Sequence, residues 1–301
     1  MPEFTPAYIE SYKNGQLKKK TKEAFDRLSN CHLCPRNCGV DRTAGETGIC
    51  KTGIRAVVAS YAPHFGEEAP LIGSHGSGTI FFTHCNLLCC FCQNYDISHE
   101  GVGSEVSKSH LARIMLHLQN LGCHNINFVT PSHVIPQIMA ALEVAVENGL
   151  NIPLVYNTGA YDNVDSLKLL DGIIDIYMPD FKFWNEKVSQ QTCKAKDYPE
   201  IARNAIKEMY QQVGDLVIED GIAKRGLLIR HLVMPDELAG TREIMRFLSK
   251  EISENTYVNI MPQYRPCGDA YSNPNLSRSI TQEEFENALM VAKEEGIWRL
   301  D

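Results

Sequence analysis

Three cysteines on one short loop constrain this chain more than any other feature. Cys85, Cys89 and Cys92 form a Cys-x3-Cys-x2-Cys triplet directly after an apolar run that is predicted to be a strand, Thr79 to Thr83. Short cysteine spacings also build zinc sites, but zinc knuckles prefer two Cys-x2-Cys pairs, so this spacing favours another metal centre. A 4Fe-4S cluster has four irons, and a loop with three thiolates leaves one iron open to an outside ligand. Chemistry would begin at that open iron.

The triplet resembles the cluster loop of the radical S-adenosylmethionine (SAM) superfamily, whose members bind the amino and carboxylate groups of SAM at the open iron. Phe91 fits this pattern, because the family usually carries an aromatic residue just before its third cysteine. The resemblance implies a 4Fe-4S cluster and SAM as cofactors, with the three cysteines as ligands and Phe91 beside the cofactors. Cys90, inside the loop, is predicted to be a spare thiol packed behind the cluster.

The bulk properties limit the class of protein. A chain of 301 residues with 44% hydrophobic content is long enough for one large domain and a small appendage. The stretch Met1 to Lys20 offers no apolar segment for a signal peptide, and no run approaches the length of a membrane span. The 11 cysteines then indicate metal binding in a reducing cytoplasm rather than disulfides. A net charge of -8 gives no basic footprint for nucleic acid.

From the triplet onward, short β-branched or apolar runs alternate with helical patterns, which is typical of βα units on a parallel sheet. Helices are expected around the stripes that begin at Leu111 and Ile135, over Pro199 to Val213, and after a capping box of Thr281 with Glu284. The predicted strands are Thr79 to Thr83, Asn125 to Thr130, Pro153 to Asn157, Ile174 to Pro179, Leu227 to Val233 and Tyr257 to Met261.

Six βα units are too few for a full eight-unit barrel, but they match the partial (β/α)6 TIM-type barrel that the resemblance implies. We therefore predict an α/β fold in which residues 77–301 form the barrel and residues 1–76 form a helical, cysteine-rich metal-binding segment. Functional groups of such barrels lie on loops at the C-terminal ends of the strands. The triplet follows the first predicted strand at that end.

A second set of cysteines lies in the predicted N-terminal segment. Four thiols fall within about twenty residues, with turn formers between them: Cys31, Cys34, Cys38 and Cys50. Tetrahedral zinc and an auxiliary iron-sulfur cluster both use four thiolates, and closed four-cysteine sites are usually structural. We favour a structural metal knot over a redox-active cluster, with zinc or a second Fe-S cluster as its occupant.

The residues around both cysteine sets restrict the resemblance to one branch of the radical SAM superfamily. They are similar to the corresponding motifs of the branch that resembles pyruvate formate-lyase activating enzymes. The similarity rests on the segment 31–50, on Pro63-His64-Phe65-Gly66-Glu67-Glu68 and on Cys92-Gln-Asn-Tyr-Asp-Ile-Ser98.

This resemblance also implies roles for residues that follow the predicted strands. Asp180 and Lys182 resemble the Asp-x-Lys element of activating enzymes, and Lys182 is expected to act there as a catalytic group by pairing with the SAM carboxylate or the substrate backbone. Asn157 begins an Asn-Thr-Gly turn and is expected to point into the barrel. Ser132 and His133 stand where the family commonly has Gly-Gly-Glu. They either contact SAM or, in the case of Ser132, cap the following helix.

Arg230 and His231 lie within the fifth predicted strand, where alternation sends one side chain inward and the other outward. One of the two is expected to face the site, and we take Arg230 as the candidate for cofactor binding.

Taken together, the resemblance implies a radical SAM oxidoreductase. A low-potential donor, ferredoxin or flavodoxin, would supply one electron, and SAM would be cleaved to methionine and a 5'-deoxyadenosyl radical that removes a hydrogen atom from the substrate. The implied substrate is a glycyl-radical enzyme, activated at a backbone glycine. Radical modification of another protein, a peptide or a small metabolite is the alternative. A non-enzymatic iron-sulfur electron carrier is the alternative of a different class.

Overall fold

A single curved sheet organises the chain. The computed structural model describes residues 4–301, and its ten-stranded sheet has the order β10-β9-β8-β6-β5-β4-β2-β1-β3, with β7 paired to β8. All six predicted strands are confirmed, and neighbours among them pair in parallel. These are β2 (Ser77–Phe82), β4 (Ile126–Val129), β5 (Leu154–Thr158), β6 (Ile176–Pro179), β8 (Ile222–Leu232) and β9 (Tyr257–Met261).

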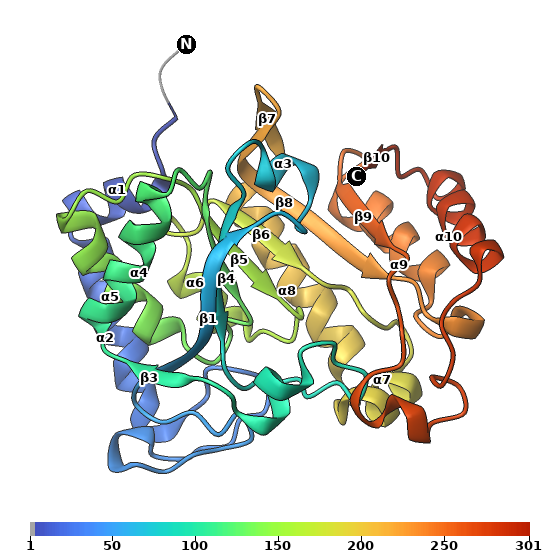
Figure 1. Ribbon diagram of the computed structural model, residues 1–301, viewed down its shortest axis with the longest axis horizontal. Helices are drawn as coiled ribbons and strands as arrows, with labels where there is room; N and C mark the ends of the chain where they lie inside the picture. The colour runs from blue at the N-terminus through green and yellow to red at the C-terminus, as the bar shows by residue number, and fades with distance from the viewer. Residues whose placement is uncertain (1–3) are drawn as a thin grey trace.

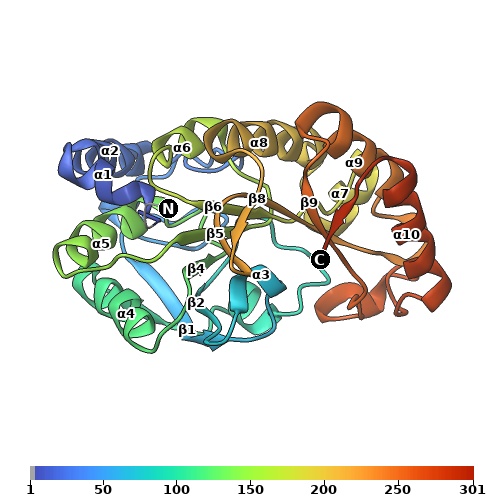
Figure 2. The same ribbon diagram turned by 90° about the horizontal axis from the view of Figure 1, so that it is seen from above.

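Helices follow the strands and cover the outer face of the sheet (Figure 2). The outer face is apolar because alternate strand residues, such as Ile126 and Phe128 of β4, enter the main core. The predicted capping box of Thr281 and Glu284 is present at the start of α10. The helices are α4 (Lys108–Asn120), α5 (Ile135–Glu147), α6 (Val164–Leu169), α7 (Glu186–Cys193), α8 (Tyr198–Val213), α9 (Thr241–Phe247) and α10 (Gln282–Glu294).

The inner face of the sheet carries the other set of alternating residues. Val155, Ile176 and Leu228 pack together there with Leu71 of the short helix α3 (Ala69–Ile72). Figure 2 shows α3 on the concave side of the strands, opposite the layer of long helices. The fold is therefore an α/β partial barrel, as predicted, with a short helix at its open side.

The N-terminal segment is joined closely to the barrel. Helices α1 (Ala7–Lys13) and α2 (Gln16–Asp26) lie next to α5, and β1 (Ala56–His64) pairs antiparallel with β2 and with β3 (Ser104–Val106). The predicted division at 76/77 stays a prediction, and residues 1–3 lie outside the described residues. In the part of the chain that is described, no helix combines the length and the apolar character needed to cross a membrane.

Short elements complete the connections (Figure 1). The predicted strand pattern did not include β1, β3, β7 (Val217–Glu219) or β10 (Arg299–Leu300). β1 with β3 extends the sheet at one edge and β10 at the other, whereas β7 pairs with β8 off the main strand order. Single helical turns occur at Arg27–Asn30, Arg42–Ala44, Asp96–Glu100, Pro235–Glu237, Leu248–Ile252 and Gly268–Ser272.

Candidate active site

The three cysteines of the triplet lie on the loop that leaves β2 at the C-terminal end of the parallel strands, as expected. Two residues of the loop, His84 with φ 70° and Leu88 with φ 55°, adopt left-handed backbone conformations that are uncommon outside glycine. These turns fold the loop back on itself. The Leu87 amide donates a hydrogen bond to the Cys85 thiol over 3.3 Å. The loop is thus shaped around its own sulfur atoms.

Burial keeps these thiols protonated in the absence of a metal. It raises the pKa of Cys85 to about 12 and also raises the pKa of Cys92. As the side chains stand, residues 4–301 contain no group of three or more His, Cys, Asp or Glu arranged to hold a metal ion. The donor set nevertheless fits an iron-sulfur cluster, because three thiols on one loop are the ligand type that such clusters use.

Aromatic packing anchors the loop. The ring of Phe91, a predicted cofactor neighbour, is only 4% exposed and makes edge contacts with Phe183 and Tyr264 at centroid distances of 5.7 and 6.0 Å. Phe183 follows β6 and Tyr264 follows β9, so the loop is held against connections from both parts of the sheet. Cys90, the predicted spare thiol, is partly buried against the main core.

A buried thiol that the sequence reasoning missed lies beside the triplet. Cys193, at the end of α7, is fully buried, and its thiol donates a hydrogen bond to the Cys89 thiol over 3.3 Å. The contact with Cys193 and burial together raise the pKa of Cys89. The Thr192 carbonyl also accepts a hydrogen bond from the Cys90 amide over 2.8 Å. Nothing in the local sequence around Cys193 signals this meeting across 104 residues.

The predicted polar residues of β5, β6 and β8 form one network. Asp180 accepts hydrogen bonds from Arg230 Nε and Lys182 Nζ, each over 2.6 Å. Arg230 also donates to Asn157 Oδ1 over 2.7 Å. Alternation resolves the choice within β8, because Arg230 points to the inner face with Leu228, whereas His231 points outward and is fully buried.

The charged groups of this network stabilise one another's ionised forms. Burial opposes ionisation of Asp180, but Arg230 and Lys182 outweigh burial and lower its pKa. Burial likewise disfavours the charged form of Lys182, yet Asp180 reverses the effect and raises its pKa. All three groups therefore carry their charge at neutral pH. The ammonium of Lys182, with one donor used by Asp180, keeps two donors for a ligand.

The loop that carries Cys85, Cys89 and Cys92, called the cluster loop below, meets the network of Asp180 and Lys182 at the rim of the barrel. At Gly159, directly after β5, a Cβ atom would lie 3.2 Å from Leu87 of the loop and 3.6 Å from Cε of Lys182. The neighbouring loop residue Asn86 donates to the Tyr161 carbonyl over 2.7 Å. Glycine at 159 therefore lets the cluster loop approach the side chain of Lys182.

Ser132 and His133 lie behind the rim and are almost fully buried. The N-cap of α5 is Val134, so the capping alternative for Ser132 is wrong, and its hydroxyl instead bonds that of Thr158 at 3.1 Å. The His133 ring bonds the Thr83 carbonyl at 3.0 Å, just before the triplet. Burial lowers the pKa of His133 to about 3, so its ring is neutral.

The second cysteine set is compact and largely buried. Burial raises the pKa of Cys34 to about 12, and nearby Cys31, Cys38 and Cys50 raise it further. A Cβ at Gly48 would collide with the Cys38 thiol, so glycine at this position leaves room for the sulfur. Four neighbouring thiols suit zinc and an iron-sulfur cluster equally well. His32, predicted to lie at the surface, is exposed.

Arg36, within the second cysteine set, was missed by the sequence reasoning. Its guanidinium donates hydrogen bonds to four backbone carbonyls over 2.6 to 3.1 Å, at Asn86, Leu87, Cys193 and Lys194. Two of these carbonyls lie between the first and second cysteines of the triplet. A charged donor with a fixed fork geometry is well suited to such a role. The second cysteine set, residues 31–50 and called the four-cysteine segment below, therefore holds the cluster loop through direct hydrogen bonds.

A second brace comes from Arg42, which is 1% exposed. It donates to the His133 carbonyl over 2.9 Å, and the His133 ring in turn contacts the Thr83 carbonyl. In the sequence, the only sign of the contacts made by Arg36 and Arg42 was the presence of arginines among closely spaced cysteines.

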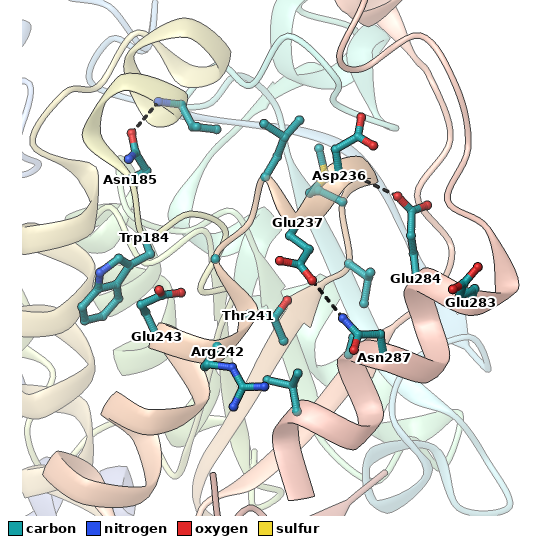
Figure 3. A pocket seen from close by; sticks show the side chains of 17 residues that line it. Trp184, Asn185, Asp236, Glu237, Thr241, Arg242, Glu243, Glu283, Glu284 and Asn287 are labelled. Atoms are coloured by element: carbon teal, nitrogen blue, oxygen red, sulfur yellow. Dashed lines mark hydrogen bonds between the residues drawn. The ribbon is translucent and has the colours of Figure 1, made fainter. Parts of the chain in front are cut away.

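A cavity of about 690 Å³ lies apart from these residues, between α7, the connection after β8, and α10 (Figure 3). Arg278 bonds Glu284 at 2.7 Å, and Asn287 bonds Glu237 at 2.9 Å, so part of its acidic lining is already paired. None of the predicted site residues is among the described residues that line it.

Two comparisons by sequence relate the chain to known proteins. The model of the radical SAM superfamily matches residues 79–248, more than half of the chain. An uncharacterized protein of Methanocaldococcus jannaschii is 34% identical over 293 residues, which cover 95% of this chain and 80% of that protein.

Solved structures show a more distant likeness. The AdoMet-bound structure of anSMEcpe has a TM-score of 0.49 and 11% identity, covering 70% of this chain and 57% of that one. Methylornithine synthase (PylB) has a TM-score of 0.47 and 12% identity, covering 72% of this chain and 62% of that one. At these values the likeness does not extend to a site or a substrate. The family match and the cysteine loop together establish that the chain belongs to the radical SAM superfamily, whose cofactors are a 4Fe-4S cluster and SAM.

Proposed function

We propose that this radical SAM enzyme acts on a glycyl-radical enzyme, from whose backbone glycine it removes a hydrogen atom. The observation that carries the enzymatic part is the meeting of the cluster loop with Lys182 and Asp180 at one rim of the barrel. An electron carrier has no need of that charged network. The choice of a glycyl-radical enzyme as substrate is supported by the resemblance of Asp180 and Lys182 to the Asp-x-Lys element of activating enzymes.

When bound, the cluster and SAM would supply the radical chemistry, and a ferredoxin or flavodoxin would supply the electron that this chemistry consumes. Cys85, Cys89 and Cys92 would hold the cluster. Lys182 would orient a carboxylate or a peptide carbonyl with its two remaining donors. Asp180 fixes the position of that ammonium through its 2.6 Å bond. The low exposure of Lys182 and Asp180, 16% and 15%, limits the access of water to these side chains.

Radical modification of another protein, a peptide or a metabolite is the second candidate. The same rim would serve it equally, since Lys182 can bind the carboxylate of a free metabolite as readily as a peptide group. A non-enzymatic electron carrier, the third candidate, predicts no SAM binding. We further propose that the four-cysteine segment holds a structural metal and that the enzyme works in a reducing cytoplasm, where thiols stay available for metal.

Anaerobic reconstitution with iron and sulfide, followed by an assay for 5'-deoxyadenosine, tests the enzymatic proposal. Dithionite and SAM alone should already give slow cleavage. Protein and small-molecule fractions of an extract of the producing organism should then be added separately. Stimulation by the protein fraction, with a glycyl-type radical signal on a large protein, is expected. Stimulation by the small-molecule fraction alone would favour the second candidate instead, and the absence of any cleavage would contradict the enzymatic proposal.

A further inference from the structure

Two adjacent glutamates lie on the connection that crosses the open side of the barrel. Glu67 and Glu68 belong to the connection between β1 and α3, which spans from one edge of the sheet toward the other. Glu68 accepts a hydrogen bond from Asn259 of β9 over 2.9 Å. Glu67 lies 3.5 Å from Arg230 of β8, which also lies 3.9 Å from Glu68. Both carboxylates are therefore part of the inner face, next to the network of the candidate active site.

The inner site holds three carboxyl groups, Glu67, Glu68 and Asp180, against two buried basic groups, Lys182 and Arg230. Burial raises the pKa of Glu67 even though Arg230 lies beside it, so the two basic groups do not fully compensate for the burial of this carboxyl group. His64 lies 3.5 Å from Glu67, but its ring is 45% exposed and stands outside the buried group. Glu67 and Glu68 are 7% and 3% exposed. A buried carboxylate without a full partner is costly, so ionisation of Glu67 calls for a further counter-charge at this site.

Hydrogen-bonding capacity is also left unused at the inner face. The second oxygen of Glu68, Oε2, has no partner within residues 4–301, and neither has the amide of Asn127. Asn127 is fully buried and stands beside Val155 in the strand register. Val155 and Leu71, which stands three residues beyond Glu68, belong to one buried apolar cluster. A free carboxylate oxygen and a free amide thus face the same interior, and buried polar atoms of this kind usually have a partner.

We propose that this inner site binds a protonated amine or guanidinium group of the substrate, held by Glu68 with Glu67 supplying the second negative charge. The inference rests on the proposed function, because it places the cation on the same inner face as Asp180 and Lys182, next to Arg230. Such a group supplies both the missing positive charge and the N–H donors that Glu68 Oε2 and the Asn127 oxygen lack. The substrate is then a molecule or peptide with a basic nitrogen near its reacting carbon.

The test uses the full-length protein, reconstituted and supplied with SAM. Two probes represent the two sources of a cationic nitrogen: n-butylammonium for a primary amine and n-propylguanidinium for a guanidinium. n-Butanol is the neutral counterpart. Binding is followed by saturation-transfer NMR and by calorimetry. Saturable binding of one or both cations to the wild type is expected, with no saturable binding of n-butanol, and the preferred cation identifies the source.

Glu68→Gln removes one charge but keeps an oxygen that can accept from Asn259, and it should weaken binding at least tenfold. Glu67→Gln gives a second variant in case the first folds poorly, with a smaller loss expected. Glu283→Gln is the matched control, because it removes the same charge from an exposed position on α10 and should bind like the wild type. Circular dichroism of each variant reports on folding.

Equal binding by Glu68→Gln and the wild type, an equal loss in Glu283→Gln, or no binding to the wild type would overturn the proposal. Formation of 5'-deoxyadenosine without probe, in the same wild-type preparation, reports separately on the proposed function. Cleavage without cation binding would leave the enzyme assignment standing and remove only the inner cation site.

Discussion

The guanidinium of Arg36 donates a hydrogen bond over 2.8 Å to the carbonyl of Asn86, 50 residues away. One residue belongs to the four-cysteine segment and the other to the cluster loop. The four-cysteine segment and the cluster loop are therefore joined by a direct hydrogen bond.

Replacing Arg36 by Ala should weaken both the fold and the cluster loop. The change removes four hydrogen bonds to backbone carbonyls and should lower the free energy of unfolding by on the order of 2–4 kcal/mol. It should also broaden the EPR spectrum of the reduced cluster, because the loop loses its fixed position. Arg55→Ala is the control, since Arg55 is exposed and lies 3.7 Å from Glu105. A destabilised Arg36→Ala protein with an unaltered EPR spectrum would show that the brace is purely structural.

Alanine at Cys85, Cys89 or Cys92 should abolish the 4Fe-4S spectrum and SAM cleavage, because each removal leaves the cluster with two thiolates from the loop. Cys90→Ala should retain both. Iron and sulfide counts, together with the 5'-deoxyadenosine assay, provide the measurement. Loss of cleavage in Cys90→Ala, with Cys85→Ala still active, would mean that the assigned ligand set is wrong.

Cys193→Ala should lower the reduction potential of the cluster. The thiol of Cys193 donates to Cys89, and a donor at a ligand sulfur stabilises the extra negative charge of the reduced state. Cys193→Ser keeps a donor and should lie closer to the wild type. Potentiometric titration followed by EPR measures the effect. A potential that does not change in Cys193→Ala would contradict this role, and loss of one iron would instead identify Cys193 as a ligand.

Cys34→Ser should lower the melting temperature more than it alters chemistry per folded molecule, since a closed four-thiolate site contributes folding free energy. Metal analysis distinguishes the occupants. One zinc with about four irons per chain is expected for a structural knot beside a single 4Fe-4S cluster. About eight irons, with a second reducible centre, would make the knot an auxiliary cluster.

Acid should destabilise the protein through His231. Burial lowers the pKa of His231 to about 4, so its folded form stays neutral while the unfolded form gains a proton near pH 6.5. Stability is therefore complete above pH 6.5 and is lost as the pH falls toward 4, by about 3 kcal/mol for this group. His231→Gln should flatten that part of the profile, as measured by urea unfolding from pH 7 to 4. Equal slopes for both proteins would rule out this contribution.

Local patterns determined much of this protein. The spacing of Cys85, Cys89 and Cys92, the alternation of strands and helices, and the capping box at Thr281 are all properties of neighbouring residues. All six parallel strands followed from these patterns, and the family resemblance carried by the triplet implied the superfamily and the partial barrel. Alternation also required Arg230 and His231 to face opposite ways. It could not say which one faced inward, because that depends on the side of the sheet that the helices cover.

Only the tertiary structure decided which distant groups meet. No local pattern reveals the partners of Glu67, Arg36 and Cys193, which lie 163, 50 and 104 residues away in the chain. These contacts arise because the sheet curves until the β1–α3 connection reaches β8 and β9, and because the cluster loop is pressed between the four-cysteine segment and α7. Hydrophobic periodicity reports which face of an element is buried, but the curvature and closure of the sheet fix which buried groups become neighbours.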